Sequence, residues 1–320
     1  MVPSYTLGVV LAAMLLDAVI GDPPALWRRL PHPVVLFGRL IGALERALNQ
    51  GPMRRVKGIL AMVVVVLIAG LIGGAISSAL MPFSWGWIVE ALVISILIAQ
   101  KSLIQHVRAV MEPLARHDLS GARSALARIV GRDVSVLDEA GVARAGIETL
   151  AENASDGVIA PIFWGGLFGL PGIMIYKAVN TADSMIGHRD ERHEAFGWAA
   201  ARLDDLLNLI PARLTGILIC AAALVTPDNS AAGAIRIMLR DARKHPSPNA
   251  GFPEAAAAGA LGLRLGGPRV YDGQRDDAPW MGDGRAEATA RDMERAVKSV
   301  LASFVLTGLS ILILWLLTPQ

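Results

Sequence analysis

Long uncharged runs are the strongest pattern along the 320-residue chain. Residues 58–81 and residues 299–317 contain no charged side chain. At a rise of about 1.5 Å per residue, roughly 20 apolar residues cross the hydrocarbon core of a bilayer. Both runs therefore predict transmembrane helices.

Two further apolar runs predict additional spans. Residues 84–99 contain one acid, Glu90, and only Pro82 and Phe83 separate them from the first run, so together these two runs predict a transmembrane hairpin. Residues 5–20 are shorter and contain Asp17 near their end. An acid in a short apolar run has a cost to explain, so Asp17 is a candidate functional residue with a structural role as the alternative, whereas Asp22 before two prolines can simply end the first helix.

Residues 157–179 and 206–226 are apolar but interrupted by polar and helix-breaking residues. The interruptions are Pro161, Pro171, Lys177 and several glycines in the first stretch, and Asn208, Pro211 and Arg213 in the second. Backbone breaks at membrane depth are tolerated where protein or a wet cavity satisfies the freed polar groups. We therefore expect broken or re-entrant helices around a cavity, with two ordinary tilted spans as the alternative.

The basic residues predict the orientation of the chain. Residues 21–57 and 100–156 contain seven lysines and arginines each, residues 227–298 contain eleven, and the link at Pro82–Phe83 contains none. Because cytoplasmic loops are enriched in these residues, we expect a single integral membrane domain over residues 1–320 with these three loops in the cytoplasm. Residues 180–205 also lie on the cytoplasmic side if residues 157–179 and 206–226 form re-entrant segments that enter the membrane and return to the same side.

Composition and periodicity define the fold class. The chain is 53% hydrophobic and 18% charged, against about a quarter charged in soluble domains. No stretch alternates with period two for long enough to predict a sheet. Short cytoplasmic helices are expected over residues 104–116, 121–130, 137–153, 231–243 and 285–298. Ser120 is the expected N-cap of the second of these helices. The prediction is an all-α, polytopic integral membrane protein with broken or re-entrant helices and cytoplasmic helical loops.

Several classes of function are disfavoured. The net charge of +2 is too small to indicate nucleic acid as a partner. A single cysteine, Cys220, excludes a disulfide within the chain and a cysteine metal site. The sequence contains no Walker loop, no G-x-G-x-x-G and no H-E-x-x-H, so neither an ordinary nucleotide fold nor a zinc site is indicated.

Three polar clusters carry candidate chemistry. The first contains Glu148, Glu152, Asn153 and Asp156, and the spacing of four residues places the three acids on one helix face. These acids are either ligands of Mg²⁺ or the solvated face of a helix. The second runs from Asn180, Asp183 and Ser184 through residues 188–192 to Arg202, Asp204 and Asp205. Acids and arginines near hydrocarbon either form structural ion pairs or hold metal and phosphate.

The third cluster lies in residues 240–254. Arg240, Arg243, Lys244 and His245 precede a turn that contains prolines, Ser247, Asn249 and Gly251, and a helix of small residues follows. Backbone N–H groups of a turn that enters a helix are a natural anion site, and a rigid turn between helices is the alternative.

These motifs resemble a family of membrane proteins of cobalamin biosynthesis, CbiB, called CobD in some pathways. The resemblance is carried by Leu16-Asp17, Gly21-Asp22-Pro23, His32-Pro33, Glu152-Asn153-Ala-Ser-Asp156-Gly157, Tyr176-Lys-Ala-Val-Asn180-Thr-Ala-Asp183-Ser184, Phe196-Gly197, Arg202-Leu-Asp204-Asp205, Ile210-Pro211-Ala-Arg213 and Lys244-His245-Pro-Ser247-Pro-Asn249-Ala-Gly251. It extends from about residue 7 to the final helix. Ala182 and His188 depart from the family pattern and leave the carboxylates in place.

The resemblance implies adenosylcobinamide-phosphate synthase activity in a bacterial inner membrane. This activity joins adenosylcobyric acid to (R)-1-aminopropan-2-ol or its O-phosphate, with ATP as co-substrate and Mg²⁺. An acyl phosphate is the expected intermediate, because a carboxylate is a poor electrophile. Besides the corrinoid, the amino alcohol and the bilayer, other cobalamin-biosynthesis enzymes are expected partners.

Site residues follow from the same motifs. The expected metal ligands are Glu152, Asp156, Asp183, Asp204 and Asp205. The expected catalytic residues are Asp183, Asp205, Glu152 and His245. The expected substrate and phosphate ligands are Asn153, Asn180, Arg189, Arg192, Arg202, Arg213, Arg243, Lys244, Ser247, Asn249 and Gly251.

A transporter or a non-catalytic membrane regulator or sensor is the alternative class. Broken helices with charges at membrane depth are also typical of secondary transporters. The chain lacks a repeated half, and it contains all of the acidic clusters together with the turn at residues 244–251. A regulator does not need this complete polar set, so the sequence favours the enzyme.

Overall fold

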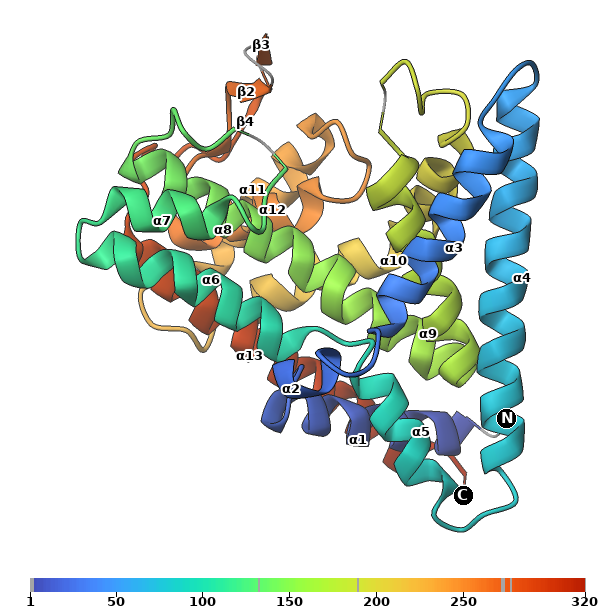
Figure 1. Ribbon diagram of the computed structural model, residues 1–320. Helices are drawn as coiled ribbons and strands as arrows, with labels where there is room; N and C mark the ends of the chain where they lie inside the picture. Colours follow the sequence, from blue (N-terminus) through green and yellow to red (C-terminus); the bar gives the residue numbers. More distant parts are fainter. Residues whose placement is uncertain (1–2, 132, 189, 272–273, 277, 320) are drawn as a thin grey trace. The chain divides into compact units, whose positions relative to one another are not determined.

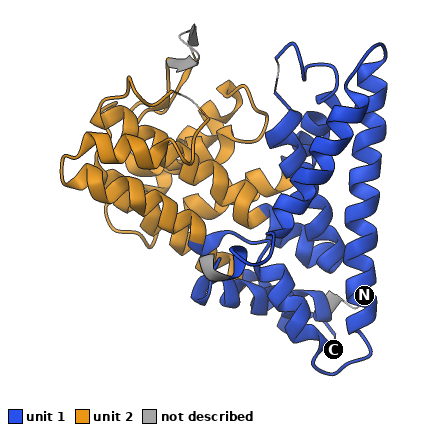
Figure 2. Ribbon diagram, in the orientation of Figure 1, with its two compact units in different colours: residues 1–101, 160–208, 310–320 blue, residues 102–159, 209–309 orange. Residues whose placement is uncertain are grey.

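The computed structural model describes residues 3–131, 133–188, 190–271, 274–276 and 278–319. These residues divide into two compact units (Figures 1 and 2). Unit 1 comprises residues 1–101, 160–208 and 310–320, and unit 2 comprises residues 102–159 and 209–309. Helices α10 (Trp198–Ala222) and α13 (Ala290–Leu317) each contribute residues to both units.

Unit 1 is built around one long helix, α9. Its elements are α1 (Pro3–Val19), α2 (Pro24–Trp27), α3 (Pro33–Leu48), α4 (Arg54–Leu80), α5 (Gly86–Ser95), α9 (Ala160–Ile186), the first part of α10 and the end of α13. Helices α1, α3, α4 and α5 all pack against α9. This arrangement buries Leu170, Ile173 and Tyr176 completely.

Unit 2 is a second helical assembly with two small two-stranded sheets. Its elements are α6 (Gln100–Ala115, whose first two residues lie in unit 1), α7 (Leu119–Leu126), α8 (Glu139–Asn153), η1 (Ala154–Ile159), the rest of α10, α11 (Ala231–Asp241), η2 (Ala242–Lys244), α12 (Gly251–Leu261), β1 (Leu265–Gly266), β2 (Arg269–Tyr271), β3 (Gln274–Asp276), β4 (Trp280–Met281) and most of α13. Where α10, α11 and α12 meet, Ile219, Ala234, Met238 and Ala256 form a core.

The exposed side chains of the long helices show which environment surrounds them. Within the described residues, five helical stretches are long and apolar enough to cross a membrane: Arg54–Leu80, Gly86–Ala115, Glu139–Ile186, Trp198–Ala222 and Ala290–Leu317. In α4 the exposed side chains include Leu60, Leu67 and Leu71, and in α13 they include Val305 and Leu317. Large apolar side chains that face outward along whole helices indicate lipid. The predicted class, an all-α polytopic membrane protein, is confirmed.

The turn between α4 and α5 matches a membrane–water interface. Phe83, Trp85 and Trp87 are about half-exposed there, and the rings of Phe83 and Trp85 stack with centroids 4.8 Å apart. Amphipathic aromatic rings favour the level of the lipid headgroups. Below this turn, Glu90 of α5 is buried and accepts hydrogen bonds from Tyr5 Oη at 2.8 Å and Ser77 Oγ at 2.5 Å. The acid in the span thus joins three helices.

Asp17 has a structural partner. Its carboxylate accepts the backbone N–H of Gln100 at 2.8 Å, at the start of α6, and Lys101 Nζ donates to the carbonyl oxygens of Val19 and Ile20 at the end of α1. Each residue satisfies groups that a helix end leaves without an intrahelical partner. The two helix ends therefore cap one another, which accounts for an acid in a short apolar helix.

The two interrupted segments differ. Helix α9 is broken at Gly169, whose φ of 64° and ψ of −150° lie in a region that essentially only glycine adopts. Helix α10 continues through Pro211, so the break predicted over residues 206–226 is absent. Proline removes the N–H that would bond the carbonyl oxygen of Leu207, and the indole Nε1 of Trp164 donates to that oxygen at 3.1 Å instead.

Two smaller predictions are also corrected. Helix α7 is capped by Asp118, whose side chain accepts the N–H of Gly121, and not by Ser120. Strand β1 pairs with β4, and β2 pairs with β3, both antiparallel, where no sheet was expected. These strands are two or three residues long, which is too short for an alternating pattern to be visible.

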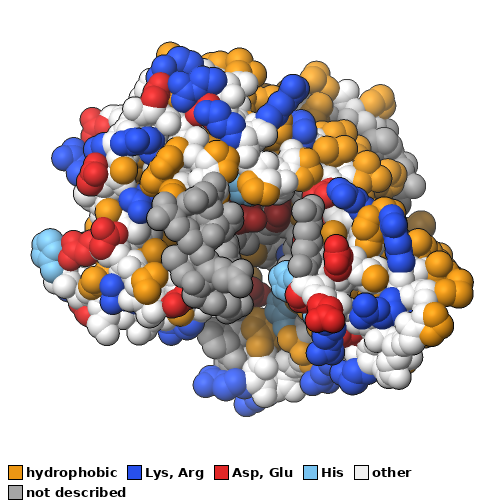
Figure 3. All heavy atoms as spheres, turned by 90° about the horizontal axis from the view of Figure 1, so that it is seen from above, with side chains coloured by type: hydrophobic (Ala, Val, Ile, Leu, Met, Phe, Trp, Pro, Cys, Tyr) orange, Lys and Arg blue, Asp and Glu red, His pale blue; other side chains and the backbone are white. Residues whose placement is uncertain are grey.

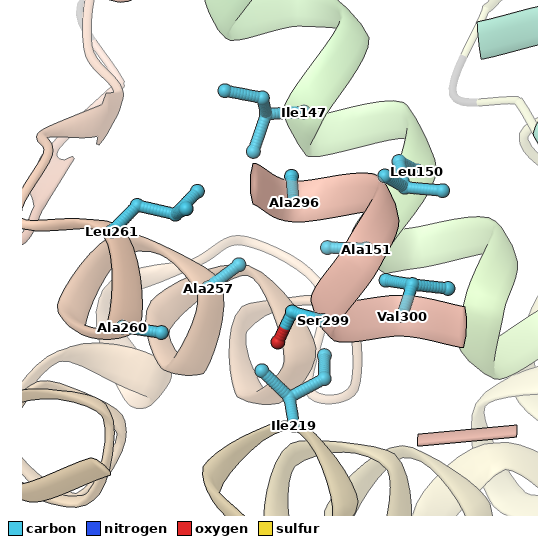
Figure 4. A pocket seen from close by; sticks show the side chains of 10 residues that line it. All are labelled: Ile147, Leu150, Ala151, Ile219, Ala257, Ala260, Leu261, Ala296, Ser299 and Val300. Carbon is cyan, nitrogen blue, oxygen red and sulfur yellow. The ribbon is translucent and has the colours of Figure 1, made fainter. Parts of the chain in front are cut away.

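Small residues allow close packing inside unit 2. Helix α12 is buried along nearly its whole length and packs against α11. A side chain at Gly259 would lie 2.2 Å from the carbonyl oxygen of Gly233. Helices α8, α10, α12 and α13 line a small apolar cavity of about 10 Å³ whose wall includes Ser299 (Figure 4).

Candidate functional site

A buried polar chain joins α9 to α10 in unit 1. Tyr176 Oη donates to Asn208 Oδ1 at 2.9 Å, Asn208 Nδ2 donates to Asp204 Oδ2 at 2.9 Å, and Asn180 Nδ2 donates to Asp204 Oδ1 at 3.1 Å. We call these four residues the Asp204 network. Tyr176 and Asn208 are at most 1% exposed and Asp204 is 9% exposed. Both oxygens of a buried carboxylate are thereby held by amide donors, which fixes its orientation.

The network also defines the register of the helix pair. Tyr176 lies opposite Asn208 and Asn180 lies opposite Asp204, so α9 and α10 run antiparallel. The same register brings Ile186 to Gly197, where an added side chain would lie 1.5 Å from the Ile186 carbonyl oxygen. Glycine in the Phe196-Gly197 motif is therefore required for close packing of the two helices.

Asp183 lies one turn beyond Asn180 on α9. It is partly exposed, and a side chain at Gly187 would lie 2.0 Å from its Oδ1, so Gly187 leaves room for this carboxylate. Asp205 is half-buried and pairs with Arg202 at 3.5 Å on the same helix. Of these three carboxylates of unit 1, Asp204 is buried and fixed, whereas Asp183 and Asp205 are accessible.

The connection between α9 and α10 is attached to α3. Arg192 Nη2 lies 2.7 Å from Glu45 Oε1, and His193 places Nε2 at 3.1 Å from Glu45 and Nδ1 at 2.9 Å from Asp190. The hydrogen bond from the His193 ring lowers the pKa of Asp190. Arg192, expected to bind phosphate, is therefore part of an ion-pair cluster here, and Arg189 lies outside the described residues.

Unit 2 builds a compact loop from the third cluster. His245 Nδ1 accepts the N–H of Ser247 at 3.1 Å, and Ser247 Oγ accepts the N–H groups of Asn249 and Ala250, each at 3.2 Å. A side chain at Gly251 would lie 2.0 Å from the carbonyl oxygen of Ala242, so glycine is required there. These three N–H groups are used inside the loop, which favours the rigid turn, the alternative interpretation of this cluster.

The loop instead positions side chains. Arg213 of α10 donates to Asn249 Oδ1 at 3.1 Å and to the carbonyl oxygen of Pro248 at 3.4 Å, and its guanidinium lies 4.2 Å from the ring centroid of Phe252. Arg243 lies in η2, at the start of the same loop. Guanidinium groups match anionic oxygens well, so Arg213 and Arg243 are both candidates to bind an anion.

His245 and Lys244 have defined partners. His245 Nε2 lies 3.7 Å from Glu254 Oε1, a buried carboxylate of α12. Lys244 Nζ lies 2.7 Å from Asp241, which also accepts Arg240 at 2.7 Å and the N–H of Gly282 at 2.7 Å. The hydrogen bonds from Arg240 and Lys244 hold the pKa of the fully buried Asp241 carboxyl well below its ordinary range. Asp241 therefore anchors the start of the loop.

The first cluster separates into different environments. Glu148 is buried and accepts the N–H of Gly266 from β1 at 2.7 Å, which gives it a structural role. Glu152 is exposed, Asn153 donates to the Thr149 carbonyl oxygen at 2.9 Å, and Asp156 lies in the π-helix η1. Because a π-turn changes the residue spacing per turn, the acids do not continue one straight stripe.

Sequence reasoning did not include Tyr176 and Asn208 among the site residues. Both lie four positions from a predicted site residue, Tyr176 before Asn180 and Asn208 after Asp204. Side chains four apart share a helix face, so this spacing was the available signal.

The described residues contain no group of three or more His, Cys, Asp or Glu side chains close enough to hold a metal ion. Magnesium bound with a nucleotide needs only one or two protein carboxylates, because phosphates and water complete its shell. The oxygens of Asp204 each accept an amide hydrogen bond and retain lone pairs, so the donor set fits such a site.

The fold and these clusters define a polytopic helical membrane protein that buries an organised polar network between two of its long helices. Charged side chains of both signs are also numerous on the face shown in Figure 3.

The comparisons with known proteins place the chain in one family. The family described as "CobD/Cbib protein" matches residues 10–300, and the chain belongs to it. "Cobalamin biosynthesis protein CobD" of Rhodobacter capsulatus is 46% identical over 312 residues, covering 96% of this chain and 98% of that protein. The proteins of the same name from Sinorhizobium fredii and Brucella suis are 48% and 47% identical, covering 90% and 93% of this chain and 90% and 94% of their own lengths. No solved structure is a significant match.

Proposed function

We propose that this member of the cobalamin-biosynthesis family is an ATP-dependent amide ligase of the adenosylcobinamide-phosphate synthase type. It joins a propionate carboxyl of adenosylcobyric acid to (R)-1-aminopropan-2-ol or its O-phosphate. The observation that carries the proposal is the Asp204 network, in which a carboxylate is buried and oriented between two apolar helices. Such groups are costly near hydrocarbon and are typical of functional sites.

The proposed reaction has two chemical steps. The substrate carboxylate oxygen attacks the γ-phosphorus of ATP, which gives an acyl phosphate and ADP. The amine nitrogen then attacks the acyl carbon, the C–O bond to phosphate breaks, and the amide, inorganic phosphate and a proton are released. The barrier to the first step lies in the charge on the transferred phosphoryl group, so positioned cations lower it.

The residues of each unit have distinct proposed roles. In unit 2, Arg213 and Arg243 bind phosphoryl oxygens, and Asn249 holds Arg213 in place. His245 orients the loop, because its Nδ1 accepts the Ser247 N–H and its Nε2 lies 3.7 Å from Glu254, so the proton of the amine is proposed to pass to an accessible carboxylate. In unit 1, Asp183 and Asp205 are the accessible carboxylates.

Magnesium supplies charge neutralisation at the phosphates when it is bound. The candidates to hold it form two separate groups, Asp183, Asp204 and Asp205 in unit 1 and Glu152 and Asp156 in unit 2, and one or two carboxylates of a single group suffice. The remaining expected ligands, Asn153, Asn180, Arg202, Lys244, Ser247 and Gly251, support the loops and helices that carry these groups.

The test is amide formation by the purified full chain in detergent. Adenosylcobyric acid, ATP and Mg²⁺ are supplied with aminopropanol or its phosphate, and corrinoid product and ADP are measured. Asp183→Asn and Asp204→Asn should lose product, whereas Asp133→Asn, a matched change at an exposed acid, should retain it.

Two outcomes contradict the proposal. Release of AMP in place of ADP rules out the acyl phosphate. A folded wild-type chain that binds corrinoid and forms no product excludes the ligase and favours a regulator or transporter.

A further inference from the structure

A polar cavity in unit 2 lies apart from the residues assigned to the proposed reaction. It has a volume of about 260 Å³ and is lined by Asp228, Arg285, Thr289, Arg291, Asp292 and Arg295. Asp228 follows the end of α10, and the other residues surround the start of α13. Three guanidinium groups against two carboxylates leave an excess of positive charge in the wall.

The buried acid of this cavity has its charge compensated. Asp292 is 1% exposed, accepts the N–H and the hydroxyl of Thr289 at 2.9 and 2.7 Å, and pairs with both Arg285 and Arg295. It therefore holds two guanidinium groups in fixed positions at the cavity wall. A second anion near these arginines meets little net repulsion from Asp292.

Arg291 is the cation of the wall that retains the most binding capacity. Arg285 and Arg295 use both terminal nitrogens in hydrogen bonds, and Arg295 Nε, which has no hydrogen-bond partner in the described part of the chain, is buried. The side chain of Arg291 is 80% exposed, and its pair with Asp228 is long, at 3.4 Å, with Asp228 itself 64% exposed. Exposed ion pairs of this kind contribute little, so an incoming anion displaces the Asp228 carboxylate at small cost. The planar forks of arginine match phosphate oxygens well.

The cavity lies at the border of two apolar surfaces. One helical turn separates Arg295 from Ser299, where the uncharged run of α13 begins. On the α10 side, Leu224 and Val225 precede Asp228 and are 77% and 68% exposed. Exposed apolar side chains beside a cationic pocket fit a ligand that carries both an anionic group and a hydrocarbon chain.

We propose that this cavity binds the phosphate group of an anionic phospholipid such as phosphatidylglycerol. Arg291 contacts the phosphate oxygens directly, Arg285 and Arg295 add positive charge from the cavity wall, and Leu224 and Val225 contact the acyl region. Free phosphate shares the same recognition chemistry, and the hydrocarbon contact distinguishes the two sources. The proposal does not depend on the ligase reaction.

The test measures binding to the delipidated full chain in detergent by native mass spectrometry and by the shift in thermal-unfolding midpoint. Three probes are compared: phosphatidylglycerol, diacylglycerol with the same acyl chains, and inorganic phosphate. Phosphatidylglycerol should bind at least about tenfold more tightly than diacylglycerol, which lacks the phosphate, and this is the effect of one charge-assisted hydrogen bond. Arg291→Gln, at an exposed position, should remove that preference.

Two further variants sharpen the result. Asp228→Asn should tighten binding, because it removes the competing carboxylate and asparagine tolerates the φ of 64° at this position. Arg236→Gln is the matched control, since Arg236 is 62% exposed in the same unit and lies outside the cavity wall. It should leave lipid binding unchanged.

The outcomes separate the possibilities. Binding of inorganic phosphate as tight as that of phosphatidylglycerol, lost in Arg291→Gln, overturns the lipid assignment and leaves a phosphate site. An unchanged lipid preference in Arg291→Gln, or an equal loss in Arg236→Gln, overturns the site itself. Amide-forming activity should be unaffected by Arg291→Gln, so failure of this inference and failure of the proposed function are distinguishable.

Discussion

The hydroxyl of Ser299 provides a sharp test of the packing in unit 2. Its Oγ is buried and has no hydrogen-bond partner among the described residues. The cavity that Ser299 lines is otherwise formed by alanine, leucine, isoleucine and valine side chains (Figure 4). We predict that Ser299→Ala stabilises the protein.

The expected size follows from the surroundings of the hydroxyl. A volume of about 10 Å³ is at the lower limit for one water molecule, and a buried water needs two to four polar partners, which this wall does not supply. An unsatisfied buried polar group costs about 1–3 kcal/mol. Removing the oxygen recovers part of this cost, so we expect a gain of about 1 kcal/mol, or roughly 2–4 °C in the unfolding midpoint.

The assay is thermal unfolding in one detergent, followed by tryptophan fluorescence. Ser303→Ala is the matched control, because Ser303 is fully buried one turn later on α13 and donates to the Val300 carbonyl oxygen at 2.7 Å. That variant should lose up to about 1 kcal/mol. If Ser299→Ala is also destabilising, the hydroxyl has a partner such as a bound water, and the reasoning is refuted.

Three further predictions use the same unfolding assay. Gly259→Ala should destabilise by about 1–3 kcal/mol, because its Cβ would lie 2.2 Å from a carbonyl oxygen of α11, whereas Gly74→Ala, with nothing within 4 Å, should not destabilise. Asn208→Leu should cost about 2 kcal/mol, because Asp204 loses a donor in a buried site, and an unchanged midpoint would exclude the network as a stabilising contact. The folded-state pKa of Asp241 lies below its ordinary value of 3.8, so its contribution to stability is complete above that pH and is lost as pH falls through the folded value. Asp241→Asn should therefore reduce the fall in unfolding midpoint at acid pH. A fall of unchanged size would contradict this role.

Much of the fold is predictable from the sequence because hydrophobic length is a strong signal. The uncharged runs at residues 58–81 and 299–317 lie within α4 and α13. The continuity of α10 was not predictable, because it depends on Trp164, which donates to the carbonyl oxygen that Pro211 leaves without an N–H. The sequence of residues 206–226 alone does not reveal that contact, because Trp164 lies in another helix.

The candidate site shows a similar division. Motif spacing selects Asn180 and Asp204, and the structure joins them by a hydrogen bond of 3.1 Å. Spacing could not distinguish Glu148 from Glu152, since the first is bonded to a β-strand far along the chain and the second faces outward. Roles that depend on long-range partners are absent from local patterns.

The hydrogen bond between Ser77 and Glu90 also bears on how the protein enters the membrane. The two residues lie on consecutive helices, α4 and α5, that are joined by a short uncharged turn. A helical hairpin of this kind can leave the translocation machinery as one unit, and its single acid then already has a hydroxyl partner inside the same unit. Membrane insertion of Glu90 therefore does not have to await the docking of Tyr5 from α1.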